Sequence, residues 1–187
     1  MNTFERVKLS TSHKALRPDA VASANDAATK WETPAILNQC LAHVLDLQAR
    51  NKLAQWTAKA GNFDDFHTMF GDFSKELSTI ADELSARVVA LGGAPAWLPA
   101  TTAMASKLPP YLAGIAPLTE HFDALISSYD AASKYLPAVV AKVTRGGDHA
   151  TANTVAELVK VLDTQKHFIA SHMPVDWTTA SKQHSAN

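Results

Sequence analysis

The chain of 187 residues contains a single cysteine, Cys40, so one copy cannot form an internal disulfide. Cys40 lies in an apolar stretch with helical spacing, which favours a buried, unreactive thiol over a catalytic one. No stretch approaches the roughly 18 apolar residues of a membrane span. The opening residues, MNTFERVKLSTSHK, lack the apolar segment of a secretory signal. We therefore expect a cytoplasmic protein without a membrane partner.

The sequence also lacks an excess of charge of either sign. It has 17 lysines and arginines against 18 aspartates and glutamates, for a formal net charge of −1. This balance excludes a uniformly basic nucleic-acid binder, so any contact with DNA has to come from a local basic segment. Hydrophobic residues make up 47% of the chain. Together with the length, this share predicts one globular domain around one core.

Apolar residues recur at intervals of three and four in four long segments, which predicts four helices. The first helix is expected over residues 33–59, with Thr33 as its cap and Pro34 at its first helical position. The second is expected from Phe63 to Leu91, where a pair of glycines forms a stop signal.

The third predicted helix covers residues 117–143 and contains Pro137, which should kink it. The fourth begins with either Asp148 or Thr151 as its cap and ends near Met173. No segment shows the alternation of a convincing strand.

A long connection rich in proline, alanine and threonine separates the second and third helices at residues 94–116, with a short helix expected near 104–108. Four helices with one such connection are the pattern of a ferritin-like bundle. We therefore predict an all-α fold, a ferritin-like four-helix bundle with a long crossover between the second and third helices. It should occupy residues 33–173, with a flexible tail at 1–32 and another at 174–187.

The most specific part of the sequence runs from the end of the first helix into the second. It resembles the signature of the Dps family, the DNA-protecting mini-ferritins of the ferritin-like superfamily. In that family Lys-x-x-His-Trp ends the first helix, Gly-x-x-Phe-x-x-x-His opens the second, and Asp-x-x-x-Glu-Arg precedes a Leu-Gly pair. The matching residues here are Lys52, Trp56, Phe63, His67, Asp82, Arg87, Leu91 and Gly92, and Gly61 lies one position after the family's glycine.

The resemblance implies a homo-oligomer, a hollow shell of twelve subunits that oxidises and stores iron and often binds DNA without sequence preference. We therefore expect a shell subunit that protects the cell under stress. Carried over position by position, the family's iron ligands fall on His67 and Asp82, which are retained, and on Gln55, Gly71 and Ala86, which are substituted.

His67 and Asp82 are 15 residues apart on one predicted helix, or about 22 Å at 1.5 Å per residue. They can hold one ion together only across two subunits, which the resemblance places at a two-fold axis. One histidine and one aspartate with water bind a divalent ion weakly, because iron prefers imidazole and anionic oxygen. We predict weak iron binding with weak or absent ferroxidase activity, so enzymatic function stays open.

Three other acids are candidates to compensate for the lost ligands, namely Asp72, Glu76 and Glu83. A step of one residue turns a side chain by about 100° around a helix, so Asp72 and Glu83 do not replace their neighbours without a bulge. Glu76 is spaced to pair with Asp72. The favoured interpretation is that all three are solvated acids on the inner or outer face of the shell. Trp56 is expected to pack near the two-fold interface, beside the iron site.

Several histidines favour a structural interpretation. His43 lies among apolar residues and is expected to be a satisfied interior or interface histidine. His167 and His172 are five residues apart, so they do not share a helix face as a metal-binding pair would, and a surface or packing role is favoured. Asp148 and His149 stand at a helix start, where capping is the default.

Basic residues of the N-terminal tail are the candidate DNA contacts, and twelve copies would add weak contacts together. Acidic residues in the same tail favour the alternative that it packs on the shell. A second function is also open, in which the fold has exchanged metal chemistry for a structural or ligand-binding role. The candidate DNA-binding residues are Arg6, Lys8, Lys14 and Arg17.

Overall fold

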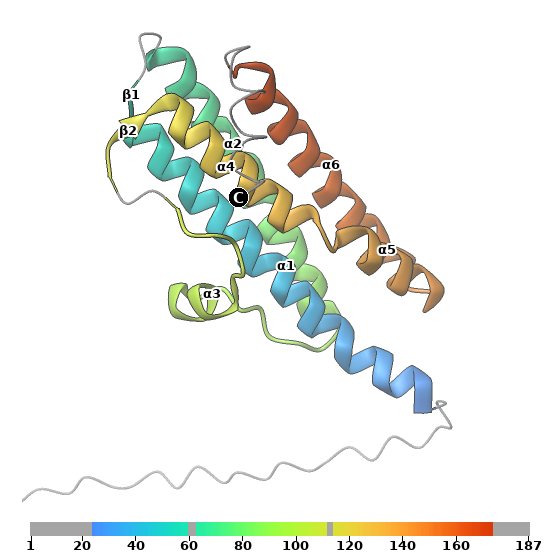
Figure 1. The fold of residues 1–187 in the computed structure, drawn as a ribbon. Coiled ribbons are helices and arrows are strands. Elements are labelled where there is room, and N and C mark those ends of the chain that lie inside the picture. Colours follow the sequence, from blue (N-terminus) through green and yellow to red (C-terminus); the bar gives the residue numbers. More distant parts are fainter. Residues whose placement is uncertain (1–23, 60–62, 112–113, 174–187) are drawn as a thin grey trace, which may run out of the picture.

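The computed structural model describes residues 24–59, 63–111 and 114–173. Four long helical segments lie side by side as a bundle, and a short helix lies beside them in the crossover (Figure 1). The predicted all-α fold and its long crossover are confirmed. Within the described ranges, no helix has both the length and the apolar character needed to cross a membrane. The helices are α1 (Ala24–Thr57), α2 (Phe63–Ala90), α3 (Pro99–Ala105), α4 (Leu118–Ser133), α5 (Leu136–Arg145) and α6 (His149–Ser171).

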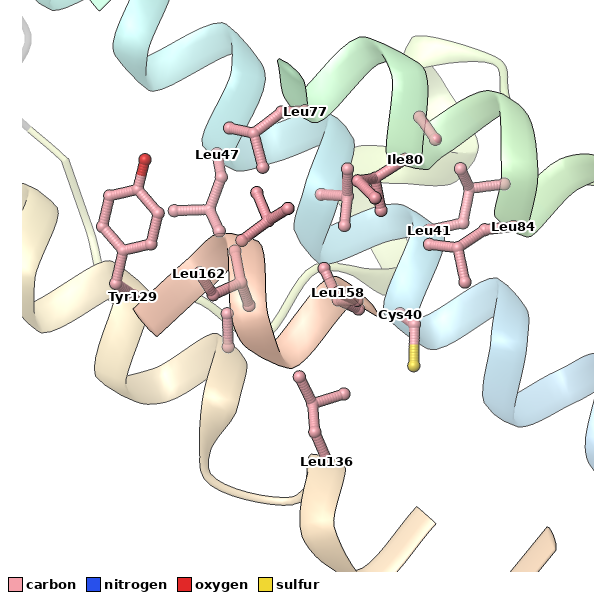
Figure 2. Close-up of a cluster of buried hydrophobic side chains, with 14 of the residues drawn as sticks. Cys40, Leu41, Leu47, Leu77, Ile80, Leu84, Tyr129, Leu136, Leu158 and Leu162 are labelled. Carbon is pink, nitrogen blue, oxygen red and sulfur yellow. The ribbon is translucent and has the colours of Figure 1, made fainter. Parts of the chain in front are cut away.

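The core lies between these segments, and leucine is its most frequent residue (Figure 2). Burying each such side chain stabilises the fold by roughly 1.5–3 kcal/mol relative to exposure. Cys40 lies in this core with no exposed surface, as predicted, and burial raises the pKa of its thiol to about 11. The labelled leucines come from α1, α2, α5 and α6: Leu41, Leu47, Leu77, Leu84, Leu136, Leu158 and Leu162.

The predicted start of the first helix is wrong. α1 begins at Ala24, so residues 24–32 of the expected tail are helical, and Pro34 lies inside the helix rather than at its first position. Pro34 is buried, and an added Cβ on Gly93 would stand 2.9 Å from the proline Cβ. Close packing of the proline ring against the end of α2 offsets the helix hydrogen bond that proline cannot make. The remaining parts of the expected tails, 1–23 and 174–187, lie outside the described residues.

α1 also ends two residues before the predicted boundary. Ala58 and Lys59 form a short strand, β1 (Ala58–Lys59), which pairs in parallel with β2 (Ala116–Pro117) before α4. Apolar alternation did not predict this ladder, because a strand of two residues is too short to show it. The ladder joins the end of α1 to the start of α4.

Proline has a stronger effect in the third helix than the expected kink. The helix is divided into α4 and α5, and Pro137 stands in the first turn of α5. Proline has no N–H to donate back to residue 133, so the hydrogen-bond ladder ends there. The crossover helix α3 likewise begins at Pro99, earlier than the expected 104–108. In both places proline opens a new helix.

Asp148 caps α6 and joins it to α2. One carboxylate oxygen accepts from the backbone N–H of Thr151 at 3.0 Å, and the other accepts from the Thr151 hydroxyl at 2.5 Å. Arg87 of α2 donates to Asp148 at 2.6 Å and to Thr151 at 2.7 Å. Burial alone would raise the pKa of Asp148, but these bonds outweigh burial and lower it. Of the two expected caps, Asp148 is the residue that caps the helix.

Polar side chains on one flank of α1 hold the crossover against the bundle. Asn38 bonds the backbone on either side of Pro95, donating to the Ala94 carbonyl at 3.0 Å and accepting from the Ala96 N–H at 2.9 Å. Gln39, on the same helix, donates to the carbonyl of Ala105. The crossover is therefore held to α1 through its backbone, and these bonds do not restrict its side chains.

His43 is the buried centre of this attachment and is only 4% exposed. Its Nε2 accepts from the Lys107 N–H at 3.2 Å, so the neutral ring carries its proton on Nδ1, which lies 3.1 Å from the Tyr135 hydroxyl. The expectation of a satisfied interior histidine is confirmed. Burial lowers the pKa of His43 from 6.5 to about 4, with Asp46 opposing the shift and Lys107 and Arg50 adding to it.

Between pH 6.5 and pH 4 the unfolded chain binds a proton at His43 that the folded chain does not. The free energy of unfolding should therefore decrease as the pH is lowered through this window, by about 1.4 kcal/mol per pH unit from this residue. In His43→Gln, which keeps a polar side chain but cannot titrate, that part of the slope should vanish. Urea unfolding at a fixed protein concentration measures it. The exposed His167→Gln variant is the control, and an unchanged slope in His43→Gln would contradict the assignment.

Candidate functional site

A polar groove of about 640 Å³ runs between the C-terminal half of α1 and the N-terminal half of α2. It brings together three of the expected ligand positions, Gln55, His67 and Gly71, together with Asp72. Most of the other lining side chains are neutral or cationic, and none is a glutamate. They are Leu45, Gln48, Ala49, Lys52, Thr68, Ser74, Lys75 and Ser78.

Gln55 fills the inner end of this groove and is only 7% exposed. Its Nε2 donates to the backbone carbonyl of His67 at 3.1 Å, which ties α1 to the first turns of α2. A Cβ added to Gly71 would stand 2.7 Å from the same nitrogen. The carboxamide therefore lies where a side chain at position 71 would begin. Its Oε1 is buried and has no hydrogen-bond partner.

His67 is half-buried beside Trp56, with ring centroids 5.0 Å apart and planes at 79°. Trp56 is 64% exposed, and the ammonium group of Lys52 lies 5.8 Å from its ring centroid. Trp56 therefore lies against His67, and its place beside a two-fold interface stays a prediction. A large exposed indole is unusual on a free surface and is a common residue at interfaces.

Asp82 and Ala86 lie farther along α2 and are exposed, as is Glu83. The helix separates Asp82 from His67 by 15 residues, or about 22 Å. One chain therefore does not bring the two retained ligands together. Among the described residues, no group of three or more His, Cys, Asp or Glu side chains is placed to hold a metal ion.

The candidate compensating acids have other partners. Asp72 pairs with Lys75 at 3.0 Å on the surface, and Glu76 accepts from Gln165 of α6 at 2.7 Å. Glu76 is therefore bonded to Gln165 of α6 and Asp72 to Lys75, and the two acids are not paired with each other. Neither acid replaces the carboxylate that Gly71 lacks.

Glu76 is the end of a polar chain that sequence reasoning missed. Asn51 of α1 donates to the Tyr129 hydroxyl at 2.9 Å, which donates to Gln165 at 2.6 Å, and Gln165 donates to Glu76. Each of the four long segments contributes one residue. The available signal was a polar residue at an apolar position of its helix, but a single sequence does not show which such residues meet.

The remaining candidates have structural roles or lie outside the described residues. His167 is exposed, and the exposed His172 stacks on Phe168 with ring centroids 4.5 Å apart, so the favoured surface role is confirmed. A further buried histidine, His121, was missed, and its Nδ1 lies 3.0 Å from the Tyr111 hydroxyl. The four tail residues expected to contact DNA, Arg6, Lys8, Lys14 and Arg17, lie outside the described residues.

The residues of the groove do not fit an iron ion. Such an ion needs imidazole and anionic oxygen around it. Gln55 directs an N–H donor toward position 71, and its oxygen is buried, so the residue offers the ion no accessible lone pair. Gly71 and Ala86 carry no donor atom. His67 is the one remaining ligand position in the groove with a metal-binding side chain.

The bundle with its long crossover is the fold of a ferritin-like protein, and the model of the ferritin-like domain family matches residues 34–174. A DNA protection during starvation protein from Agrobacterium fabrum is 30% identical over 138 residues, which cover 74% of this chain and 85% of that protein. The chain belongs to the Dps family of mini-ferritins. A second protein of that name, from Halobacterium salinarum, is 38% identical over 65 residues, 35% of this chain and 36% of its own.

Solved structures agree on the fold. An archaeal Dps homologue from Halobacterium salinarum has a TM-score of 0.77 at 24% identity, with 89% of this chain and 94% of that chain covered. Dps from Thermosynechococcus elongatus has a TM-score of 0.74 at 20% identity, with 79% and 94% covered. A Dps protein from Vibrio cholerae is described as a member of a broad superfamily of ferritin-like diiron-carboxylate proteins.

Proposed function

We propose that this mini-ferritin is a shell subunit that protects the cell under stress by storing or excluding iron, with weak or absent ferroxidase activity. The observation that carries the proposal is the groove between α1 and α2, in which the Gln55 carboxamide lies over Gly71. The expected metal position has lost two carboxylates and one imidazole. Iron is the stored substrate of the shell, and the chain does not supply a complete set of ligands for it.

His67 and Asp82 are the remaining candidates to contact an ion, and they can meet only between two copies. With one imidazole and one carboxylate as ligands, water fills most coordination positions of the ion. Such an ion exchanges readily and does not hold a second ion beside it. Fast oxidation needs a site that fixes the ion and its oxidant, so any iron uptake should proceed without a rapid phase.

Anaerobic loading with Fe(II) followed by hydrogen peroxide tests this proposal. Stopped-flow absorbance should show oxidation close to the rate in buffer alone, because no complete ligand set surrounds the ion. His67→Ala and Asp82→Ala should then behave like the unaltered protein. A rapid peroxide-dependent phase that either substitution abolishes would refute the loss of ferroxidase activity.

We also propose that copies of the chain pair and assemble, as the family's shell of twelve implies. The face formed by α1 and α3 supports pairing, because Met104 is 89% exposed and Leu98 is 69% exposed. Beside them lies a groove of about 590 Å³, lined by Leu45, Trp97 and Leu108 among others. An exposed apolar projection next to an apolar groove is complementary to itself, which suits a two-fold contact.

Met104→Glu should weaken this contact, because burying an unpaired carboxylate in an apolar groove is unfavourable. We expect a loss of roughly tenfold or more in the affinity between copies, equivalent to about 1.4 kcal/mol. Mass photometry over a range of protein concentrations measures the distribution of assemblies. Met104→Leu keeps the apolar surface and is the matched control. Unchanged assembly of Met104→Glu would exclude this face from the interface.

Non-specific association with DNA is proposed to depend on Arg6, Lys8, Lys14 and Arg17. The net charge of −1 gives the whole chain no attraction for phosphate. A tail of weakly basic character repeated in a shell gains affinity through multivalency. Each phosphate contact releases counterions, so the association should weaken steeply with salt.

Deletion of residues 1–17 tests this part of the proposal. The full chain should retard duplex DNA in a gel shift at low salt and release it as salt increases. The deleted protein should not retard it. The deleted protein should still assemble, which mass photometry checks. Retardation that survives the deletion would place the contact elsewhere, and no retardation by the full chain at low salt would exclude DNA binding.

A second candidate function is a structural or ligand-binding homologue that keeps the shell without metal chemistry. It is favoured by the neutral and cationic lining of the groove, which includes Gln48, Lys52 and Lys75. The two functions differ in what the assembled particle carries. Iron taken up by the assembled particle supports the first function, and a particle that takes up no iron supports the second.

A further inference from the structure

We propose that Gln55 and Gly71 form an interlocked pair, in which the Gln55 carboxamide closes the former metal position from within the subunit. Gln55 is then a specificity-determining residue that keeps a cation out, an inference that rests on the proposed function for the identity of that position. The substitutions at ligand positions 55 and 71 are thereby coupled, because the side chain at one position fills the space of the other. Restoring the carboxylate alone should not restore metal binding.

The backbone gives no reason for a glycine at position 71. Gly71 lies within α2, where alanine is more favourable than glycine. Among the described residues, the glycines with positive φ are Gly92 and Gly147, so Gly71 keeps an ordinary helical conformation. An added Cβ would have Gln55 Nε2 at 2.7 Å, Cδ at 3.5 Å and Oε1 at 3.9 Å. All three of these neighbouring atoms belong to one side chain.

Gln55 in turn is held in this place. The side chain is 7% exposed, and its Nε2 bonds the carbonyl of His67, one turn before Gly71 on α2. A Cβ at position 71 would stand 2.7 Å from this nitrogen, so the carboxamide has to shift, which strains its bond to His67.

The orientation of the carboxamide also disfavours a cation. The nitrogen end is nearest to position 71, and an N–H donor presents positive charge to that space. The oxygen is the only metal-binding atom of the side chain, and it is buried away from solvent. A carboxylate introduced at position 71 would first meet this donor and accept its hydrogen bond, which occupies the lone pairs that an ion needs.

A double-mutant cycle on the full, assembled protein tests the pair. Gly71→Ala in the Gln55→Ala background should raise the urea midpoint, because the helix gains alanine without a clash. In the unaltered background the same substitution should leave the midpoint unchanged or lower it. Gln48→Ala, on the same face of α1 and not among the atoms nearest to Gly71, is the matched control background. Gln55→Ser is a second opening variant if Gln55→Ala folds poorly.

The result that would overturn the pair is additivity. If Gly71→Ala shifts the midpoint equally in the presence and absence of Gln55, the two residues are independent. This outcome does not depend on iron. Rapid iron oxidation by the unaltered protein would instead refute the proposed function. The double-mutant cycle would still decide whether Gln55 and Gly71 are coupled.

A cobalt titration tests the exclusion of a cation. Gly71→Asp with Ala86→Glu returns both carboxylates, and Co²⁺ binding to the assembled protein is followed by its visible absorption. With Gln55 retained, the affinity should be at least roughly tenfold weaker than in the same double variant carrying Gln55→Ala. The added alanine contributes no ligand, so the difference reports the removal of the carboxamide. Equal affinities would show that Gln55 does not close the position.

Discussion

The ion pair between the buried Arg50 and the half-buried Asp46 on α1 holds the crossover against the bundle. The guanidinium bonds both carboxylate oxygens at 2.8 and 3.0 Å, and also donates to the Pro109 carbonyl at 2.8 Å and the Ser128 hydroxyl at 2.7 Å. Arg50 is only 8% exposed, and such a charge is tolerated only when it is paired and fully hydrogen-bonded. One side chain therefore joins α1, α4 and the crossover.

Three faces of α1 follow from this attachment. Leu41 and its neighbours face the core, Arg50 and His43 face the crossover, and Gln55 faces α2. Because the crossover is tied through its backbone, α3 has no buried residue and leaves apolar side chains such as Met104 exposed. The proposed assembly surface and the proposed metal position thus both depend on α1. A change in how α1 is held alters both.

Much of the fold could be predicted from apolar periodicity, which reports the buried face of each helix. Pro34 was expected at the start of the helix because proline is disfavoured in helix interiors. Its packing against Gly93 outweighs this preference, and no local sequence pattern shows that contact. At the candidate site, the resemblance to the Dps family predicted that Gly71 is a substituted ligand position. The sequence could not show that Gln55 occupies the vacated space, because contacts between two helices depend on three-dimensional packing. The hydrogen bond from Gln165 to Glu76 could not be predicted from the sequence for the same reason.

The most direct measurement is a crystal structure of the assembled particle, grown without metal and soaked in Fe(II) under anaerobic conditions. Anomalous scattering at the iron edge locates any bound ion. The account predicts no ordered iron between His67 of one copy and Asp82 of its neighbour, with the Gln55 carboxamide still bonded to the His67 carbonyl and lying over Gly71. An ordered iron ion bound by His67 and Asp82, with Gln55 swung away, would contradict the central claim that this position is closed.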